Sequence, residues 1–423
     1  MNNSSQRLID VYAHWQGIAE PLLMGVLSAT VSRGKEIFAF SYNEAWLKSN
    51  QAAILDPSLQ LFSGPQYAPQ HQQNFGIFLD SSPDRWGRFL MNRREAQIAR
   101  AEERSPRKLF ESDYLLGVYD EHRMGALRFR LDPKGPFLDN DRRYASPPWA
   151  SLRELEHASL ELEKSDAESN PAYSKWLQML IAPGGSLGGA RPKASVTDEK
   201  QHPWIAKFPS SNDENDIGAW EMVVYKLALR VGIMMPEARI QKFNNRHHTF
   251  LSKRFDRTDL GERIQFTSAA TLLQRLDGED ASDGVSYLEL AEFIIRQGAK
   301  PNQDLEQLWR RIVFYICVSN VDDHLRNHGF LLSPQGWLLS PAYDINPVVN
   351  AVGLKLNISD SDNSLDLSLA REVAEYFRVK VDRANEIIEE ILRAVGNWRA
   401  EARLMEISTN EQDRMKSAFI AKE

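Results

Sequence analysis

The spacing of apolar and polar positions divides the chain into a strand-rich first part and a helix-rich second part. Residues 8–12 and 37–42 are rich in β-branched and aromatic side chains and predict strands. The same pattern over 204–208, 238–243 and 249–255 predicts three more strands, the last two joined by a turn. The predicted fold class is therefore α+β, because helical patterns dominate the remainder of the chain.

Helical spacing is clearest between Ile217 and Val231. Apolar residues there step by three and four positions and form one stripe, and Gly232 and Pro236 follow as stop signals. Further helices are predicted over 287–297, 305–319 and 379–395.

An earlier helix is predicted to begin at Ser82-Pro83-Asp84, with Ser82 as its cap. We expect Trp86 to pack inward, and the alternative is a partner or nucleic-acid surface over 84–88. A short helix or turn and then a strand follow over 115–129. The prolines of 131–150 predict a linker, and a polar helix follows over 151–168.

Composition narrows the class of protein. The 423 residues allow two or three domains, and a net charge of -7 argues against a generally basic nucleic-acid binder. The single cysteine, Cys317, excludes an intrachain disulfide framework and lies in an apolar run, so we expect it to be buried. The N-terminus lacks the apolar region of a signal peptide, and no apolar run is long enough to span a membrane. We therefore expect a cytoplasmic protein with no membrane partner.

The richest chemistry lies in a polar dozen, 319–330, between two apolar segments. Asp322 and Asn327 are five residues apart, the interval between the base and the metal-binding asparagine of a kinase catalytic loop. A hairpin predicted over 329–340 would return the chain to Asp344. We expect Asp322 to act as the base, and Asn327 and Asp344 to offer hard oxygen ligands to Mg²⁺.

A competing interpretation is a transition-metal hydrolase. It would use Asp322, Asp323, His324 and His328 as ligands. That interpretation leaves Asp344 unexplained. In a third possibility the two histidines are structural, with their ring nitrogens bonded to the backbone.

A glycine-rich stretch, 183–196, is typical of a loop whose backbone N–H groups face an anion. Its spacing is not that of a Walker loop, and a flexible turn is the plainer alternative. Lys207 follows in a predicted strand, and Glu221 follows in the helix after it. This order matches the small lobe of a protein kinase, in which the lysine reaches the nucleotide phosphates and pairs with the helix glutamate. A solvated Glu221 is equally compatible with the pattern.

In the kinase order, the chain after the last small-lobe strand is the hinge. We expect the backbone of Lys253, Arg254 and Phe255 to bind adenine, and His324 to lie beside the nucleotide. The domains expected are a β-rich subdomain over 1–130, a small lobe over 131–255 and a helical large lobe over 256–423.

These motifs together resemble the HipA family of serine/threonine protein kinases, the toxins of bacterial type II toxin–antitoxin systems. The resemblance is carried by Asp80 to Arg88, by Ser186 to Lys193, by Asn320 to Asn327 and by Tyr343-Asp344-Ile345. It implies a kinase-like bilobal fold with a β-rich N-terminal subdomain and a mainly helical C-terminal lobe. Asp323 is not a fixed part of the family pattern and is interpreted as a second acidic contact. Lys253 stands where the family often has an acidic residue.

The resemblance also implies roles, with ATP and Mg²⁺ as cofactors. Ser186 matches the autophosphorylated serine, whose modification ejects the nucleotide loop and inactivates the kinase; a phosphate there adds negative charge beside those of ATP. The loop residues implied in nucleotide binding are Gly188, Gly189, Ala190, Arg191, Pro192 and Lys193.

Family members bind a helix-turn-helix antitoxin of the HipB type, contact DNA mainly through that complex, and include kinases of aminoacyl-tRNA synthetases. Two classes of function therefore stand: an active toxin kinase, and a catalytically weak kinase-fold corepressor that acts by binding its antitoxin on operator DNA. The presence of Lys207, Asp322, Asn327 and Asp344 favours the enzyme.

Overall fold

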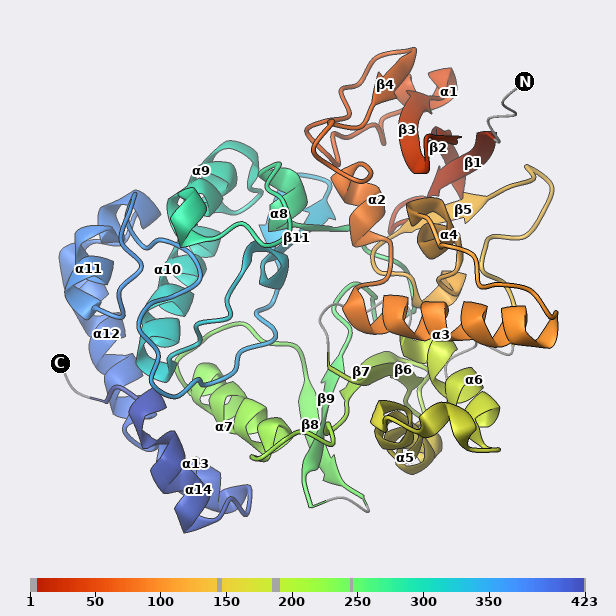
Figure 1. The fold of residues 1–423 in the computed structure, drawn as a ribbon. Helices are drawn as coiled ribbons and strands as arrows, with labels where there is room; N and C mark the ends of the chain where they lie inside the picture. Colours follow the sequence, from red (N-terminus) through yellow and green to blue (C-terminus); the bar gives the residue numbers. More distant parts are fainter. Residues whose placement is uncertain (1–5, 143–146, 185–190, 244–245, 422–423) are drawn as a thin grey trace. The chain divides into compact units, whose positions relative to one another are not determined.

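The computed structural model describes residues 6–142, 147–184, 191–243 and 246–421 (Figure 1). The chain folds into two compact units. The first comprises Met1–Ser211 and Asp256–Thr267, and the second comprises Asn212–Phe255 and Ser268–Glu423. The chain therefore passes from one unit to the other three times, and β10 (Phe266–Ser268) lies at the last passage.

A five-stranded antiparallel sheet opens the first unit, in the order β4-β3-β2-β1-β5. Its strands are β1 (Gln6–Ala13), β2 (Leu22–Ser32), β3 (Lys35–Tyr42), β4 (Pro65–Tyr67) and β5 (Leu127–Arg130). Alternate residues of β1, Ile9, Val11 and Ala13, are fully buried. This period of two is the signature of a sheet with one face in the core, and it confirms the strands expected over 8–12 and 37–42.

Helices complete the first unit: α1 (Glu44–Leu47), α2 (Gly76–Asp80), α3 (Arg85–Ala101), α4 (Glu111–Leu116), α5 (Leu152–Glu163) and α6 (Tyr173–Gly184). The expected cap of α3 at Ser82 is wrong, because the Ser82 hydroxyl donates to the Phe78 carbonyl at 2.8 Å and closes α2. Asp84 is the cap instead, and its carboxylate accepts the Arg85 N–H at 2.8 Å. Trp86 is 5% exposed, so the inward-packed interpretation is confirmed.

A hairpin of β6 (Lys193–Thr197) and β7 (Pro203–Lys207) sets Lys193 opposite Lys207. The Trp86 indole N–H donates to the Lys193 carbonyl at 2.9 Å. The segment that opens α3 is therefore hydrogen-bonded to the first residue of the strand that follows the glycine-rich stretch.

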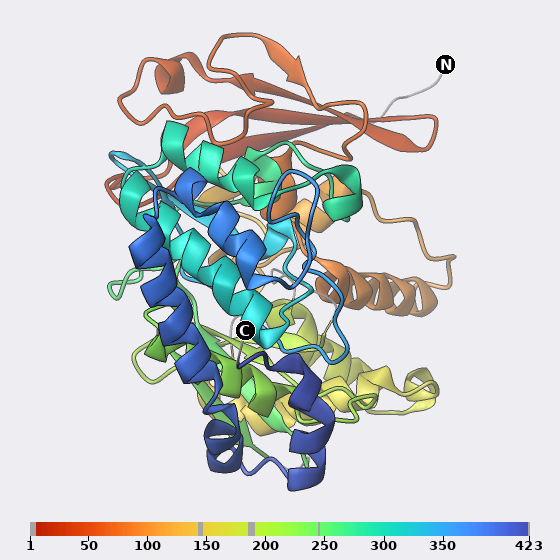
Figure 2. The same cartoon turned by 90° about the vertical axis from the view of Figure 1, so that its left-hand side faces the viewer.

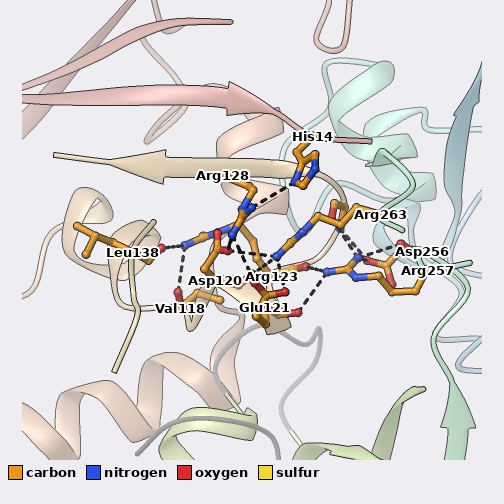
Figure 3. A network of polar contacts seen from close by, with 11 residues as sticks. His14, Val118, Asp120, Glu121, Arg123, Arg128, Leu138, Asp256, Arg257 and Arg263 are labelled. Atoms are coloured by element: carbon orange, nitrogen blue, oxygen red, sulfur yellow. Dashed lines mark hydrogen bonds and ion pairs between the residues drawn. The ribbon is translucent and has the colours of Figure 1, made fainter. Parts of the chain in front are cut away.

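Residues 256–267 are not part of a helical lobe, which corrects the expectation that the pattern turns helical after Asp256. The buried Asp256 carboxylate accepts the Gly125 N–H at 2.8 Å and pairs with Arg257 at 2.7 Å. Arg263 bonds the Asp120 carbonyl at 2.8 Å and the Asp120 carboxylate at 3.2 Å (Figure 3). These contacts explain why the segment folds with the first unit.

The second unit contains two hairpins among helices. Its elements are α7 (Ile217–Arg230), β8 (Ala238–Lys242), β9 (His248–Lys253), α8 (Ala269–Leu272), α9 (Tyr287–Gln297), α10 (Pro301–Val318), β11 (Gly329–Ser333), β12 (Gly336–Leu339), α11 (Leu367–Glu372), α12 (Val381–Val395), α13 (Trp398–Leu404) and α14 (Thr409–Met415). The expected helices and the hairpin over 329–340 are confirmed. Figure 2 shows α12 lying along α10. The α10 residues from Leu308 to Val318, Cys317 included, are buried.

Residues between Trp398 and Phe419 pack against and hydrogen-bond to the start of α7. The Trp220 ring contacts the rings of Trp398 and Phe419, each with centroids 5.9 Å away, and the latter two rings stack at 4.5 Å. The Glu411 carboxylate accepts the Asp216 N–H at 2.8 Å and the Trp220 indole N–H at 2.9 Å. The C-terminal helices therefore fix the helix that carries Glu221.

Candidate functional site

The polar loop begins where α10 ends. Ser319 takes a left-handed conformation with φ of 51°, and its N–H and that of Asn320 bond carbonyls of the last helical turn. A left-handed residue is a common helix terminator. The chain then turns so that Asp322 is exposed, as a group that reacts with an incoming hydroxyl must be.

Asn327 is hydrogen-bonded to the backbone of Asp322 and of His324. Its amide nitrogen donates to the Asp322 carbonyl at 3.1 Å, and its own N–H donates to the His324 carbonyl at 2.8 Å. Because the amide nitrogen is engaged with the loop, the amide oxygen points away from that bond and is the atom that a cation would meet. Sequence and structure therefore agree that Asp322 and Asn327 belong to one turn.

The segment of Asp344 is joined to this loop by hydrogen bonds from three residues. The Tyr343 hydroxyl donates to the Arg326 carbonyl at 2.8 Å. The Asn346 N–H donates to the Asn320 side-chain oxygen at 3.0 Å, and the Val348 N–H donates to the Ser319 carbonyl at 3.1 Å. Tyr343 and Arg326 each immediately precede a proposed metal ligand, so their bond sets Asp344 and Asn327 in register.

Asp344 itself has a left-handed backbone, with φ of 58°, and its carboxylate accepts the Asn346 amide at 3.3 Å. A carboxylate and an amide oxygen are hard donors of the kind that Mg²⁺ prefers. The donor set of Asn327 and Asp344 therefore fits a magnesium ion bound together with a nucleotide.

The side chain of Asp323, unlike that of Asp322, points into the interior of the unit. Asp323 is 1% exposed, and its Oδ2 accepts the Tyr287 hydroxyl at 2.6 Å and lies 2.7 Å from His328 Nε2. Asp323 is thus not a second acidic contact on the surface, which corrects that interpretation. His328 is structural, as one alternative held, but its ring bonds a carboxylate and not the backbone.

The transition-metal interpretation loses its ligand set for the same reason. Asp323 and His328 face the interior while Asp322 faces solvent. Within the described ranges no three His, Cys, Asp or Glu side chains gather as a metal-binding group.

The expected hinge lies at the end of β9. The Lys253 N–H donates to the Glu237 carbonyl at 2.8 Å, so this amide serves the strand pair. The Phe255 and Tyr343 ring centroids lie 5.4 Å apart, so the expected hinge lies beside the segment of Asp344 within the second unit. Arg254 is buried at 3% exposure.

The remaining candidate residues lie elsewhere. Lys207 is the last residue of β7 in the first unit, and Lys193 faces it across the hairpin. Arg191 donates to the Phe208 carbonyl at 3.4 Å, and the Phe208 N–H donates to the Pro192 carbonyl at 2.9 Å. Ser186, Gly188, Gly189 and Ala190 lie outside the described residues.

Glu221, on α7, is 5% exposed, so the alternative of a solvated glutamate is wrong. Sequence reasoning missed three contributors to the site: Tyr287, Asn320 and Asn346. Asn320 lies inside the polar segment 319–330, and Asn346 directly follows Tyr343-Asp344-Ile345. The amide group of each was the available signal, whereas Tyr287, as the first residue of a predicted helix, gave none.

Comparisons with known proteins identify the class. A family model of the HipA-like C-terminal domain matches residues 185–398, just over half of the chain. The structure resembles HipA of Shewanella oneidensis, solved in a complex of HipA, HipB and operator DNA, with a TM-score of 0.67 and 18% identity over 97% of this chain and 94% of that one. This likeness confirms the mixed α+β fold.

Two sequence relatives are named as kinases. A Haemophilus influenzae protein named "Putative kinase" is 25% identical over 38% of this chain and 52% of its own length. A Sinorhizobium fredii protein, "Putative kinase Y4mE", is 24% identical over 34% of each. The matches thus span about half and a third of these relatives. The chain belongs to the HipA family.

As to membranes, the helices that the structure describes include none with the length and apolar character needed to cross a bilayer.

Proposed function

We propose that this chain is an ATP- and Mg²⁺-dependent serine/threonine protein kinase that acts as the toxin of a toxin–antitoxin pair. The observation that carries the proposal is the joined pair of segments in the second unit, with Asp322 exposed and with Asn327 and Asp344 set in register by the Tyr343–Arg326 bond. The two relatives named as kinases support it.

In the proposed reaction, the hydroxyl oxygen of a substrate serine or threonine attacks the γ-phosphorus of ATP. The Asp322 carboxylate orients that hydroxyl and takes its proton, the bond from the γ-phosphorus to the bridging oxygen breaks, and ADP leaves. When bound, Mg²⁺ would neutralise phosphate charge and would be held by Asn327 and Asp344. Lys207 is proposed to contact the phosphates.

Nucleotide binding is proposed to involve the stretch Gly188 to Lys193, the hinge residues and His324. Because the Lys253 N–H is engaged with Glu237, Lys253 would meet adenine through its carbonyl. Ser186 is the proposed site of autophosphorylation, by which the kinase switches itself off.

The proposed partners follow from the family. The Shewanella oneidensis neighbour was solved with HipB and operator DNA, and we propose a HipB-like antitoxin for this chain, with DNA contacted mainly through the complex. An aminoacyl-tRNA synthetase is the proposed substrate. Localisation in the cytoplasm belongs to the same proposal.

The test is incubation of the full chain with labelled ATP and Mg²⁺, after its mass has shown that Ser186 carries no phosphate. Wild type should incorporate phosphate into itself and into a cell-extract protein, Ser186→Ala should lose only self-labelling, and Asp322→Ala should lose both. Asp413→Ala, an exposed aspartate on α14, is the control. Absence of any labelling by unphosphorylated wild type would leave the corepressor function, which operator binding with the antitoxin would then measure.

A further inference from the structure

The proposed function gives no role to Asp323, whose carboxylate is buried beneath the polar loop 319–330. Asp323, His328 and Tyr287 are 1%, 0% and 0% exposed. A buried carboxylate must be hydrogen-bonded or its desolvation costs several kcal/mol. Asp323 meets that requirement with two donors on Oδ2, the Tyr287 hydroxyl and His328 Nε2. The cationic Arg311, fully buried nearby, supplies opposite charge.

The spacing of these residues is informative. Asp322 and Asn327 are five residues apart, and Asp323 and His328 are the same interval, shifted by one. We call Asp322 and Asn327 the outer pair, and Asp323 and His328 the inner pair. Asp322 is exposed, and its backbone carbonyl accepts a hydrogen bond from the Asn327 side-chain amide. The inner pair is buried and joined directly at 2.7 Å. Both pairs use the same stretch of backbone, so the length of the inner contact fixes the separation of the outer residues.

The inner pair is in turn held by the helical part of the unit. Tyr287 begins α9, and its N–H donates to the Asn357 carbonyl at 3.0 Å. The His328 carbonyl accepts the Ala269 N–H at 2.9 Å. Burial, with the Asp323 carboxylate next in importance, raises the pKa of Tyr287 far above its usual value, so this hydroxyl stays a donor.

The His328 ring is packed among aromatic side chains. It lies between Tyr287 and Tyr315, with centroids 5.8 and 6.4 Å away. Nδ1 has no hydrogen-bond partner among the described residues, whereas Nε2 faces the carboxylate.

We propose that Asp323, His328 and Tyr287 are positioning residues that hold Asp322 and Asn327 at the separation that phosphoryl transfer requires. The proposal rests on the proposed kinase function and extends it to three residues that do not touch substrate or nucleotide. A positioning role is valuable in this reaction because catalysis depends mainly on placement of the reacting groups. A misplacement of about 1 Å costs roughly 100-fold in rate.

The experiment measures labelling at varied ATP concentration by wild type, Asp323→Ala, His328→Phe and Tyr287→Phe. Asp323→Ala should lower the rate at saturating ATP about 100-fold, and Tyr287→Phe, which removes one of two donors, on the order of 10-fold. The KM for ATP should change less than about threefold, because none of the residues binds nucleotide. His328→Gln, which retains a side-chain N–H, should restore part of the rate lost in His328→Phe.

A control separates positioning from a general loss of stability. Asp304 is also a buried carboxylate of this unit, and it accepts the Leu339 N–H at 3.1 Å. Asp304→Ala, which removes the acceptor of the Leu339 N–H, should lower the urea midpoint but keep the rate of the folded protein. A rate in Tyr287→Phe equal to wild type, or losses that simply follow the unfolded fraction in every variant, would overturn the proposal.

A second readout does not depend on activity. Amide hydrogen exchange over 322–328 should accelerate in Tyr287→Phe and Asp323→Ala, while exchange in α12 stays as in wild type. Unchanged exchange in the loop refutes the positioning role even for a protein that labels nothing. Labelling absent in wild type, together with loop exchange that responds, would instead reject the kinase function and keep the structural coupling.

Discussion

The contact between the C-terminal helices and α7 gives the sharpest single prediction on this chain. Glu411, on α14, accepts hydrogen bonds from the Asp216 N–H at 2.8 Å and from the Trp220 indole N–H at 2.9 Å. Trp220 is 1% exposed and directly precedes the buried Glu221. Glu411→Ala removes both acceptors at once and so tests whether the C-terminal helices hold α7 in place.

The expected magnitude follows from the two bonds. A hydrogen bond to a charged group contributes about 1.5–3 kcal/mol. Glu411 is half-buried, so water can replace part of that loss at the Asp216 N–H. We therefore expect Glu411→Ala to lower the free energy of unfolding by about 2–4 kcal/mol, and Glu411→Gln, which keeps an acceptor oxygen, by about half as much.

The assay is urea unfolding followed by tryptophan fluorescence. Asp413→Ala is the matched control on α14: its carboxylate bonds Arg399 at 2.8 Å but is 64% exposed, so its loss should cost about 0.5 kcal/mol or less. If Glu411→Ala is no less stable than Asp413→Ala, the two hydrogen bonds do not fix α7 and the reasoning is refuted.

Three further outcomes concern the first unit. Asp256→Asn should lower the free energy of unfolding by about 3 kcal/mol, because it leaves the buried Arg257 without its charge partner; adding Arg257→Met should recover part of the loss, and additive losses would contradict the pairing. Trp86→Phe, which deletes the N–H donated to Lys193, should cost about 1–2 kcal/mol in urea unfolding, whereas a neutral effect would mean that this bond contributes nothing. Burial alone would raise the pKa of Asp120, but the guanidinium of Arg263 and other nearby arginines lower it overall, so its stabilisation is present above about pH 4 and is lost as the pH falls through the lowered pKa. The stability gap between wild type and Asp120→Asn should therefore shrink in acid, and a gap independent of pH would contradict the ion network.

Local pattern predicted the helices well where their ends carry local signals. The helix over 287–297 has the predicted bounds, and its start is a capping box in which Ser286 and Glu289 bond each other's backbone N–H groups. The predicted cap of α3 was wrong because Ser82 and Asp84 are both residue types that favour a helix N-terminus. The Ser82 hydroxyl is taken by the preceding helix, which no property of residue type reveals.

Long-range contacts account for the larger misses. Residues 256–267 were expected in the helical lobe, yet Asp256 and Arg263 bind Gly125 and Asp120, more than 130 residues earlier. The proposed site residues were chosen from their spacing, which gave no sign that Asp323 turns inward. A polar dozen carries no periodicity that separates its buried side chains from its exposed ones.

The contacts between the polar loop 319–330 and the segment of Asp344 also explain why strained backbone is tolerated here. Ser319 and Asp344 hold left-handed conformations without being glycine, which costs roughly 1–2 kcal/mol at each residue. Such conformations persist where neighbouring contacts determine them. The Val348 N–H holds the Ser319 carbonyl at 3.1 Å, and the Asn346 amide holds the Asp344 carboxylate at 3.3 Å. The bonds that join the segments therefore also maintain their strained turns, so loop and metal-ligand segment behave as one preorganised element. In the proposed phosphoryl transfer, which depends on the placement of the reacting groups, that rigidity would contribute to the rate.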